Sequence, residues 1–217
     1  MAAVFVNESM LTDALRRAQA GDEHGFTDLW RMLQPRLLRY LRIAIGGLAE
    51  DVAAETWLQV VRDLPGFHGD GSRFRAWLFA VARNRAIDQA RRAGRRREDP
   101  TEIDDLTGIP DETDTETEAM TWLETERALA LIATLPREQA EAVALRVIAG
   151  LTPRQAATVL GKRPGAIRVA TMRGLNRLAE RLAAETEPTA PFEIPDAVTV
   201  TARRRVRPTG IQARTEV

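Results

Sequence analysis

The chain has 217 residues, no net charge at pH 7 and no cysteine, which excludes disulfides and thiolate metal sites. Its hydrophobic content of 44% is sufficient for one or two folded cores. No apolar run of about 18 residues is present and the N-terminus lacks the pattern of a secretory signal, so we expect a cytoplasmic protein without membrane insertion.

The first 46 residues have the apolar spacing of two successive helices. Ser9 is a suitable N-cap for the first helix, and Gly21 is a suitable end. Asp22 can cap the second helix, which should stop at the glycine pair 46–47. Pro35 lies within this second helix and is expected to kink or divide it.

A third helix is expected over about residues 49–64, with Val52, Leu58 and Val61 facing inward. The loop 64–72 follows and contains Phe67, which is either an exposed aromatic that stacks on unpaired bases or an anchor folded onto the core.

A fourth helix is expected over residues 73–97, which contain nine arginines and a single acid, Asp88. Phe74, Trp77, Leu78 and Val81 form one apolar stripe, and beyond Val81 the same face becomes polar. The second half of the helix is therefore expected to project beyond the core as a basic surface suited to nucleic acid.

Residues 98–118 contain ten acidic residues and no basic one, and they have no sustained apolar period. They are expected to link two helical domains. Further on, Thr152 and Pro153 can begin a short helix that stops at Gly161, and Pro164 can begin a longer one. This spacing favours a helix-turn-helix, with an ordinary helical hairpin as the alternative.

The sequence offers no catalytic residue, metal site or cofactor motif. Asp51 and Glu55 lie four residues apart on one helix face, but no histidine or third carboxylate is placed to complete a site. We therefore expect a solvated or partner-binding acidic face there, and we expect the tail 185–217 to be disordered.

Two segments of the chain resemble regions 2 and 4 of bacterial extracytoplasmic-function (ECF) RNA polymerase sigma factors. The first is AEDVAAETWLQVVRDLPGFHGDGSRFRAWLFAVARNRAIDQARR, and the second is LPREQAEAVALRVIAGLTPRQAATVLGKRPGAIRVATMRGLNRLAERL. The resemblance implies an all-α fold of two small helical domains joined by an acidic flexible linker. Its boundaries would be region 2 over 9–95, the linker over 96–118, region 4 over 119–184 and the tail over 185–217.

The resemblance also implies a function without enzymatic activity and a set of partners. The protein would bind core RNA polymerase, at the clamp of the largest subunit and the flap of the second-largest, and would recognise and open promoter DNA. An anti-sigma factor would be a further partner. The alternative is a conventional helix-turn-helix regulator that does not engage the core enzyme.

The residues that match the family motifs fall into three groups. Core polymerase would be contacted by Asp51, Glu55, Thr56 and Trp57, the −10 element by Phe67, Val81, Arg83, Asn84, Arg91 and Arg92, and the −35 element by Arg163, Arg168, Met172 and Arg173.

Overall fold

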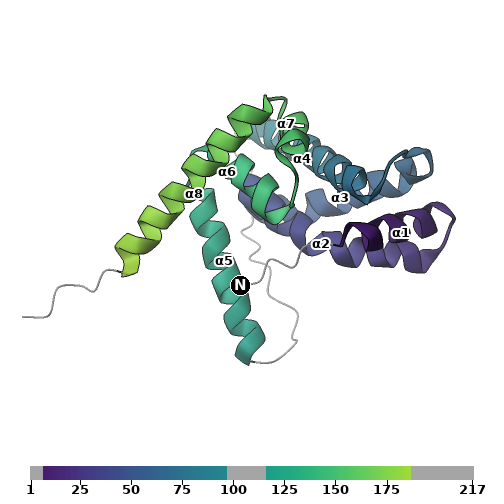
Figure 1. Cartoon of the computed structure of the whole chain (residues 1–217), viewed down its shortest axis with the longest axis horizontal. Coiled ribbons are helices and arrows are strands. Elements are labelled where there is room, and N and C mark those ends of the chain that lie inside the picture. The colour runs from purple at the N-terminus through teal and green to yellow at the C-terminus, as the bar shows by residue number, and fades with distance from the viewer. Residues whose placement is uncertain (1–6, 97–115, 187–217) are drawn as a thin grey trace, which may run out of the picture. The chain divides into compact units, whose positions relative to one another are not determined.

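The computed structural model describes residues 7–96 and 116–186, and every regular element in these two ranges is helical (Figure 1). The first range contains α1 (Glu8–Gln19), α2 (Glu23–Ile45), η1 (Gly46–Leu48), α3 (Ala49–Asp63), η2 (Leu64–Gly66) and α4 (Gly71–Arg96). The second contains α5 (Glu116–Ala133), α6 (Arg137–Val143), the π-helical turn η3 (Ala144–Ile148), α7 (Pro153–Leu160) and α8 (Pro164–Thr186). The all-α prediction is confirmed. Most of the predicted acidic linker and nearly all of the predicted tail lie outside the described residues.

The beginnings of α1 and α2 are set by short side chains that accept backbone hydrogen bonds. Asn7 caps α1, because its Oδ1 accepts hydrogen bonds from the Ser9 amide at 3.0 Å and from the Ser9 hydroxyl at 2.7 Å. The prediction that Ser9 is the cap is therefore wrong by two residues. Asp22 caps α2 as predicted, through a 2.9 Å hydrogen bond from the His24 amide.

Helix α2 continues through Pro35, so the proline does not divide it. Proline removes one backbone donor from a helix interior and crowds the preceding turn. Leu33 and Leu37 on either side are both fully buried, and this burial holds the helix together across the missing hydrogen bond.

The inward face of α3 differs from the predicted one. Leu58 and Val61 are 68% and 54% exposed, whereas Trp57 and Val60 are buried with Val52. The bulky Trp57 ring packs edge-on against Phe26 of α2 at 5.7 Å, and this contact sets the rotation of α3. The prediction was correct for Val52 and wrong for the two exposed residues.

Helices α1 and α2 approach so closely at Gly25 that no side chain fits between them. A Cβ at this position would lie 2.6 Å from both the Ala18 nitrogen and the Arg17 Cβ. Gly25→Ala is expected to lower the free energy of unfolding by about 1–3 kcal/mol, because α1 must shift to admit the methyl group. Urea unfolding followed by circular dichroism measures this. Gly47→Ala is the control, since a Cβ there meets nothing within 4 Å, and equal midpoints for the two variants would contradict the prediction.

Helices from both described ranges contribute to one buried cluster. Leu78 and Phe79 of α4 belong to the same cluster as Leu145 of η3, Leu151 before α7 and Ala156 of α7. Helices α1 to α8, up to Glu185, fall in one compact unit. The N-terminal helices (α1–α4) and the C-terminal helices (α5–α8) are therefore packed against each other.

Candidate nucleic-acid interface

The second half of α4 carries an exposed polar surface above a buried stripe. Asn84, Arg91 and Arg92 are exposed, and the Arg91 guanidinium lies 3.7 Å from the Asp88 carboxylate. Val81 is only 7% exposed and Ala86 only 4%, so the helix stays packed on the core well beyond Val81. The expectation that α4 leaves the core from about Val81 onward is therefore wrong, because alanines let this turn pack closely.

Arg83 and Arg85, in the middle of α4, are half-buried and paired with carboxylates. Arg85 donates to Gln59 Oε1 from its Nε at 3.1 Å and lies 3.5 Å from Glu55 of α3. Arg83 lies 3.5 Å from Glu141 of α6. Of the −10 residues predicted on α4, Asn84, Arg91 and Arg92 are exposed to solvent, Val81 is buried and Arg83 is paired with Glu141.

Phe67 is held against α4 as a half-buried anchor with one accessible side. Its ring lies 5.5 Å from Phe74 in an edge-on arrangement and 5.2 Å from Trp77. Its backbone carbonyl accepts a 2.7 Å hydrogen bond from Gln19 Nε2, and the same amide also reaches the Leu64 carbonyl. Of the two interpretations of Phe67, the structure favours the anchor over a freely exposed aromatic residue.

The predicted docking motif on α3 divides into an exposed and a buried half. Asp51 is exposed and the Glu55 side chain is 45% exposed. Thr56 is fully buried, and its hydroxyl donates to the Val52 carbonyl at 2.7 Å. Trp57 is 7% exposed and donates from Nε1 to Gln34 Oε1 at 2.6 Å. Only the two carboxylates can touch a partner directly.

Helices α7 and α8 form the predicted helix-turn-helix, with each boundary set by local chemistry. Thr152 caps α7, and its capping box is complete because Gln155 Oε1 accepts from the Thr152 amide at 2.8 Å. Gly161 ends α7 in the left-handed conformation with φ of 64°. Ala156 is fully buried and Ile167 is 1% exposed, as expected for residues where two helices cross.

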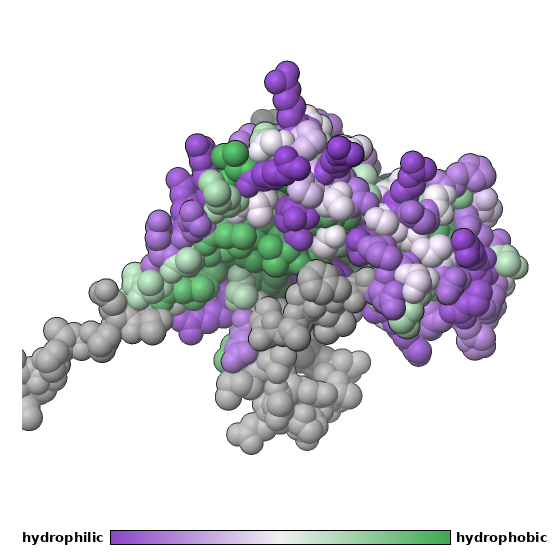
Figure 2. Space-filling view, in the orientation of Figure 1, coloured by the Kyte–Doolittle hydropathy of each residue, from purple (hydrophilic) through white to green (hydrophobic). Residues whose placement is uncertain are grey.

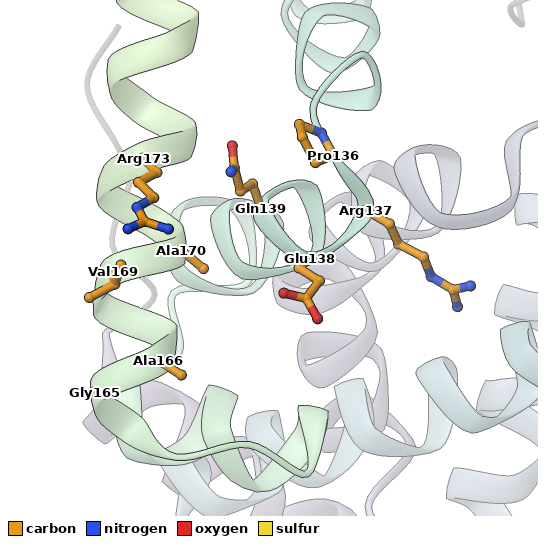
Figure 3. A pocket seen from close by; sticks show the side chains of 9 residues that line it. All are labelled: Pro136, Arg137, Glu138, Gln139, Gly165, Ala166, Val169, Ala170 and Arg173. Carbon is orange, nitrogen blue, oxygen red and sulfur yellow. The ribbon is translucent and has the colours of Figure 1, made fainter.

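The residues predicted to contact the −35 element lie exposed on α8 or just before it, but they do not share one face. Arg173 lies beside Val169 and Ala170 in an open pocket of about 450 Å³, across from the first turn of α6 (Figure 3). Arg168 and Met172 line a separate groove of about 290 Å³ next to Pro153 of α7. Arg163 is exposed in the turn before the helix. Helix α8 therefore carries exposed arginines on two sides.

Helix α8 exposes several apolar side chains, and Figure 2 shows green surface over this helix. Four of its apolar residues are between 42% and 56% exposed: Val169, Met172, Leu175 and Leu182. Val169 lies on the side of Arg173, whereas Met172 and Leu175 line the groove with Arg168, so these residues do not form a single patch.

Neither a metal site nor a membrane span is found in residues 7–96 and 116–186. No group of three or more metal-binding side chains occurs there. None of the helices in these ranges is long and apolar enough to cross a membrane.

The sequence reasoning missed a set of contacts between the N-terminal and C-terminal helices. They involve Arg36 of α2, Ser72 of α4, Glu141 of α6 and Gln155 of α7. Each contact joins residues separated by at least 58 positions in the chain, and the spacing of residues within one helix does not predict such a pair.

Two segments of the chain, one in each described range, match known protein families. Residues 29–96 match the family model for Sigma-70 region 2, and residues 125–178 match the model for Sigma-70, region 4. The chain is 32% identical to the ECF RNA polymerase sigma factor SigD of Mycobacterium tuberculosis, over 80% of this chain and 84% of SigD. It is 34% identical to the ECF RNA polymerase sigma factor ShbA of Streptomyces griseus, over 79% of this chain and 95% of ShbA.

Two solved structures share this fold. One is CnrH in complex with the cytosolic domain of CnrY, at a TM-score of 0.55 and 24% identity, covering 82% of this chain and 99% of CnrH. The other is the sigma factor RpoE of Bartonella quintana in complex with the anti-sigma factor NepR. It has a TM-score of 0.58 and 25% identity, covering 74% of this chain and 98% of RpoE.

Proposed function

Because this chain belongs to the ECF RNA polymerase sigma factors, we propose that α3, α4 and α8 divide between them the contacts that initiate transcription. As a sigma factor, the chain directs core RNA polymerase to promoters. The observation that carries this function is the presence of both region 2 and region 4 in one chain and in that order.

Helix α4 would hold the unpaired strand of the −10 element. Asn84 offers an amide that can both donate and accept hydrogen bonds at a base edge. Arg91 and Arg92 are exposed further along the helix and suit the backbone phosphates. Phe67 and Val81, being half-buried and buried, would serve as apolar walls for a flipped base.

Helix α8 would enter the major groove at the −35 element. The N-terminal part of a recognition helix meets base edges, and arginine can pair with guanine through two hydrogen bonds. Because Arg168 and Arg173 lie on different sides of α8, one can contact a base while the other holds a phosphate. Arg163 and Met172 would add a phosphate contact and an apolar contact.

The acidic face of α3 would dock on core polymerase. Asp51 and Glu55 are the exposed members of the motif, and carboxylates in this position suit a basic surface on the clamp. Thr56 and Trp57 would act indirectly, by fixing the rotation of α3 so that both carboxylates point outward.

We further infer that an anti-sigma factor binds this chain and that the chain acts in the cytoplasm without catalytic activity of its own. RpoE, a relative in fold, was solved with an anti-sigma factor. The exposed Met172 and Leu175, which line one groove of α8, are apolar groups that such a partner would cover.

The direct test is transcription by purified core RNA polymerase with and without this protein on a library of genomic fragments. Start sites that depend on the protein, together with its co-elution with the core enzyme, are the expected result. Binding to duplex DNA without any binding to the core would instead indicate a conventional regulator.

Asn84→Ala is expected to weaken promoter opening by about 1–3 kcal/mol, the range for one good base-specific contact. Permanganate reactivity of the −10 thymines measures opening, and fluorescence anisotropy measures binding to the core enzyme. Core binding should stay unchanged because Asn84 is exposed on α4 and is not one of the carboxylates proposed to dock on the core enzyme. An equal loss of both activities would contradict the assignment.

A further inference from the structure

One face of α1 runs along the loop that carries Phe67 and along the beginning of α4. Glu8, Thr12 and Gln19 are spaced by four and seven residues, so they lie on the same side of the helix. Each of these three side chains contacts a different point of the segment 64–75. Three contacts between residues distant in sequence therefore join one helix face to one short segment.

Gln19 holds the beginning of the loop through its side-chain amide. Nε2 donates to the Phe67 carbonyl at 2.7 Å and to the Leu64 carbonyl at 3.1 Å, and the two hydrogens of this group allow both bonds at once. The backbone amide of Phe67 donates to the same Leu64 carbonyl at 3.1 Å and closes the turn. Gln19 thus ties together the two ends of this turn and fixes the backbone from which the Phe67 ring projects.

Thr12 and Glu8 hold the other end of the loop, where α4 begins. Thr12 Oγ1 accepts a 3.0 Å hydrogen bond from the amide of Gly71, and a Cβ at Gly71 would lie only 2.8 Å from the Thr12 nitrogen. One turn further along α4, the guanidinium of Arg75 lies 2.5 Å from the Glu8 carboxylate, and the Arg75 side chain is only 6% exposed. Helix α1 therefore contacts both ends of the loop 64–70.

The position of the Phe67 ring depends on the path of this loop. The ring packs on the loop's own backbone, because a Cβ at Gly69 would lie 3.2 Å from Phe67 Cε1. The ring also contacts Phe74 and Trp77 of α4, at centroid distances of 5.5 Å and 5.2 Å. A change in the path of the loop would therefore move the ring relative to α4.

We propose that α1 is a brace for the loop 64–70 and that Gln19 is a positioning residue for the −10 base pocket, without touching DNA itself. The proposal rests on the proposed function in that Phe67 is taken as one wall of the pocket for a flipped base. A wall that is held in place before DNA arrives avoids the entropy cost of ordering the loop on binding, so the affinity for the base is higher. The match to Sigma-70 region 2 begins at residue 29, so this role falls to a helix outside the matched segment.

The brace is tested first without DNA, by hydrogen exchange of the loop amides measured by mass spectrometry. Gln19→Met keeps the length of the side chain and removes both hydrogen bonds. Exchange over residues 64–71 is therefore expected to be at least about 3-fold faster than in the parent protein. Met10→Ala is the matched control, because it truncates an uncharged α1 side chain that is 60% exposed, and its exchange should equal that of the parent.

A second pair of variants tests the other end of the loop. Thr12→Val removes the acceptor of the Gly71 amide and should speed exchange there, whereas Thr12→Ser keeps the hydroxyl and should restore the exchange rate of the parent. Exchange that is unchanged in both Gln19→Met and Thr12→Val would overturn the brace.

The positioning role is tested with holoenzyme that is assembled with a saturating amount of each variant. The ligand is the single-stranded −10 element of a promoter found by the start-site mapping, either intact or with one base removed at a time. The abasic strand that the parent holoenzyme binds most weakly identifies the flipped base. Gln19→Met is expected to bind the intact strand at least about 3-fold more weakly than the parent, and this abasic strand equally, because the brace acts through the base pocket.

A double variant and the remaining outcomes separate positioning from general damage. Gln19→Met combined with Phe67→Ala should bind the intact strand no more weakly than Phe67→Ala alone, because both changes act on the same wall. Equal loss for intact and abasic strands, or faster exchange without any loss, would overturn the positioning role. If the parent holoenzyme binds every abasic strand as tightly as the intact strand, the base pocket of the proposed function fails, while the exchange rates still decide whether α1 braces the loop.

Discussion

Trp57→Ala is expected to lower the free energy of unfolding by about 3–5 kcal/mol, as is typical when a buried tryptophan is truncated. The side chain is 7% exposed, packs edge-on against Phe26 and donates a hydrogen bond to Gln34. Removal of the indole leaves a cavity between α2 and α3, and it leaves Gln34 Oε1 without its hydrogen-bond donor. Urea unfolding followed by circular dichroism gives the free energy directly.

Two further variants make this result specific. Trp57→Phe keeps an aromatic ring but loses the indole donor, and we expect a smaller loss, with about 1 kcal/mol of it from the hydrogen bond. Trp30→Ala is the same truncation at a residue that is 44% exposed, so its cost should be clearly lower. If Trp57→Ala were as stable as Trp30→Ala, the structural role of Trp57 would be contradicted, and the prediction that it contacts core polymerase directly would stand again.

Asp51→Arg is expected to weaken binding to core RNA polymerase by at least about 10-fold, equivalent to about 1.4 kcal/mol. Asp51 is exposed in the first turn of α3, and a reversed charge would face the basic surface proposed for the clamp. Fluorescence anisotropy with labelled protein and purified core enzyme measures the dissociation constant. The difference should shrink as salt is raised, because exposed charges are screened.

The control for the change in net charge is Asp13→Arg, which makes the same Asp-to-Arg replacement at an exposed position of α1. It should leave the dissociation constant unchanged. Asp51→Arg also removes an acid from a helix N-terminus, at a cost of about 0.3–1 kcal/mol in stability, so binding is compared well below the unfolding midpoint. Unchanged polymerase affinity in Asp51→Arg would remove α3 from the proposed docking surface.

The helix-turn-helix was predictable because its signals act within one turn of the chain. A threonine cap, a proline in the first turn and a glycine in the left-handed conformation each work through neighbouring backbone groups. The boundaries at Thr152, Gly161 and Pro164 were therefore correct. The cap of α1 was misplaced because Asn7 and Ser9 are both good capping residues, and the sequence does not rank them.

The inward face of α3 was harder to predict because apolar residues occur around much of the helix. Leu58 and Val61 have the right spacing and composition, yet both are exposed. The choice depends on which residue best fills the space beside α2, and the tryptophan ring does so. The same rotation buries two members of the proposed docking motif, Thr56 and Trp57, so they stabilise the fold and are not accessible to a partner.

The sequence by itself determined the helices, the helix-turn-helix, the basic character of α4 and the family to which the chain belongs, since each depends on residues close together in the chain. Only the tertiary structure decided which polar and charged side chains of α4 are exposed to solvent and which are paired with other residues. Arg83 and Asn84 are neighbours in sequence, but Asn84 faces solvent while Arg83 is paired with Glu141. That pairing arises from the packing of helices distant in sequence, where shape and burial select partners that no local pattern specifies.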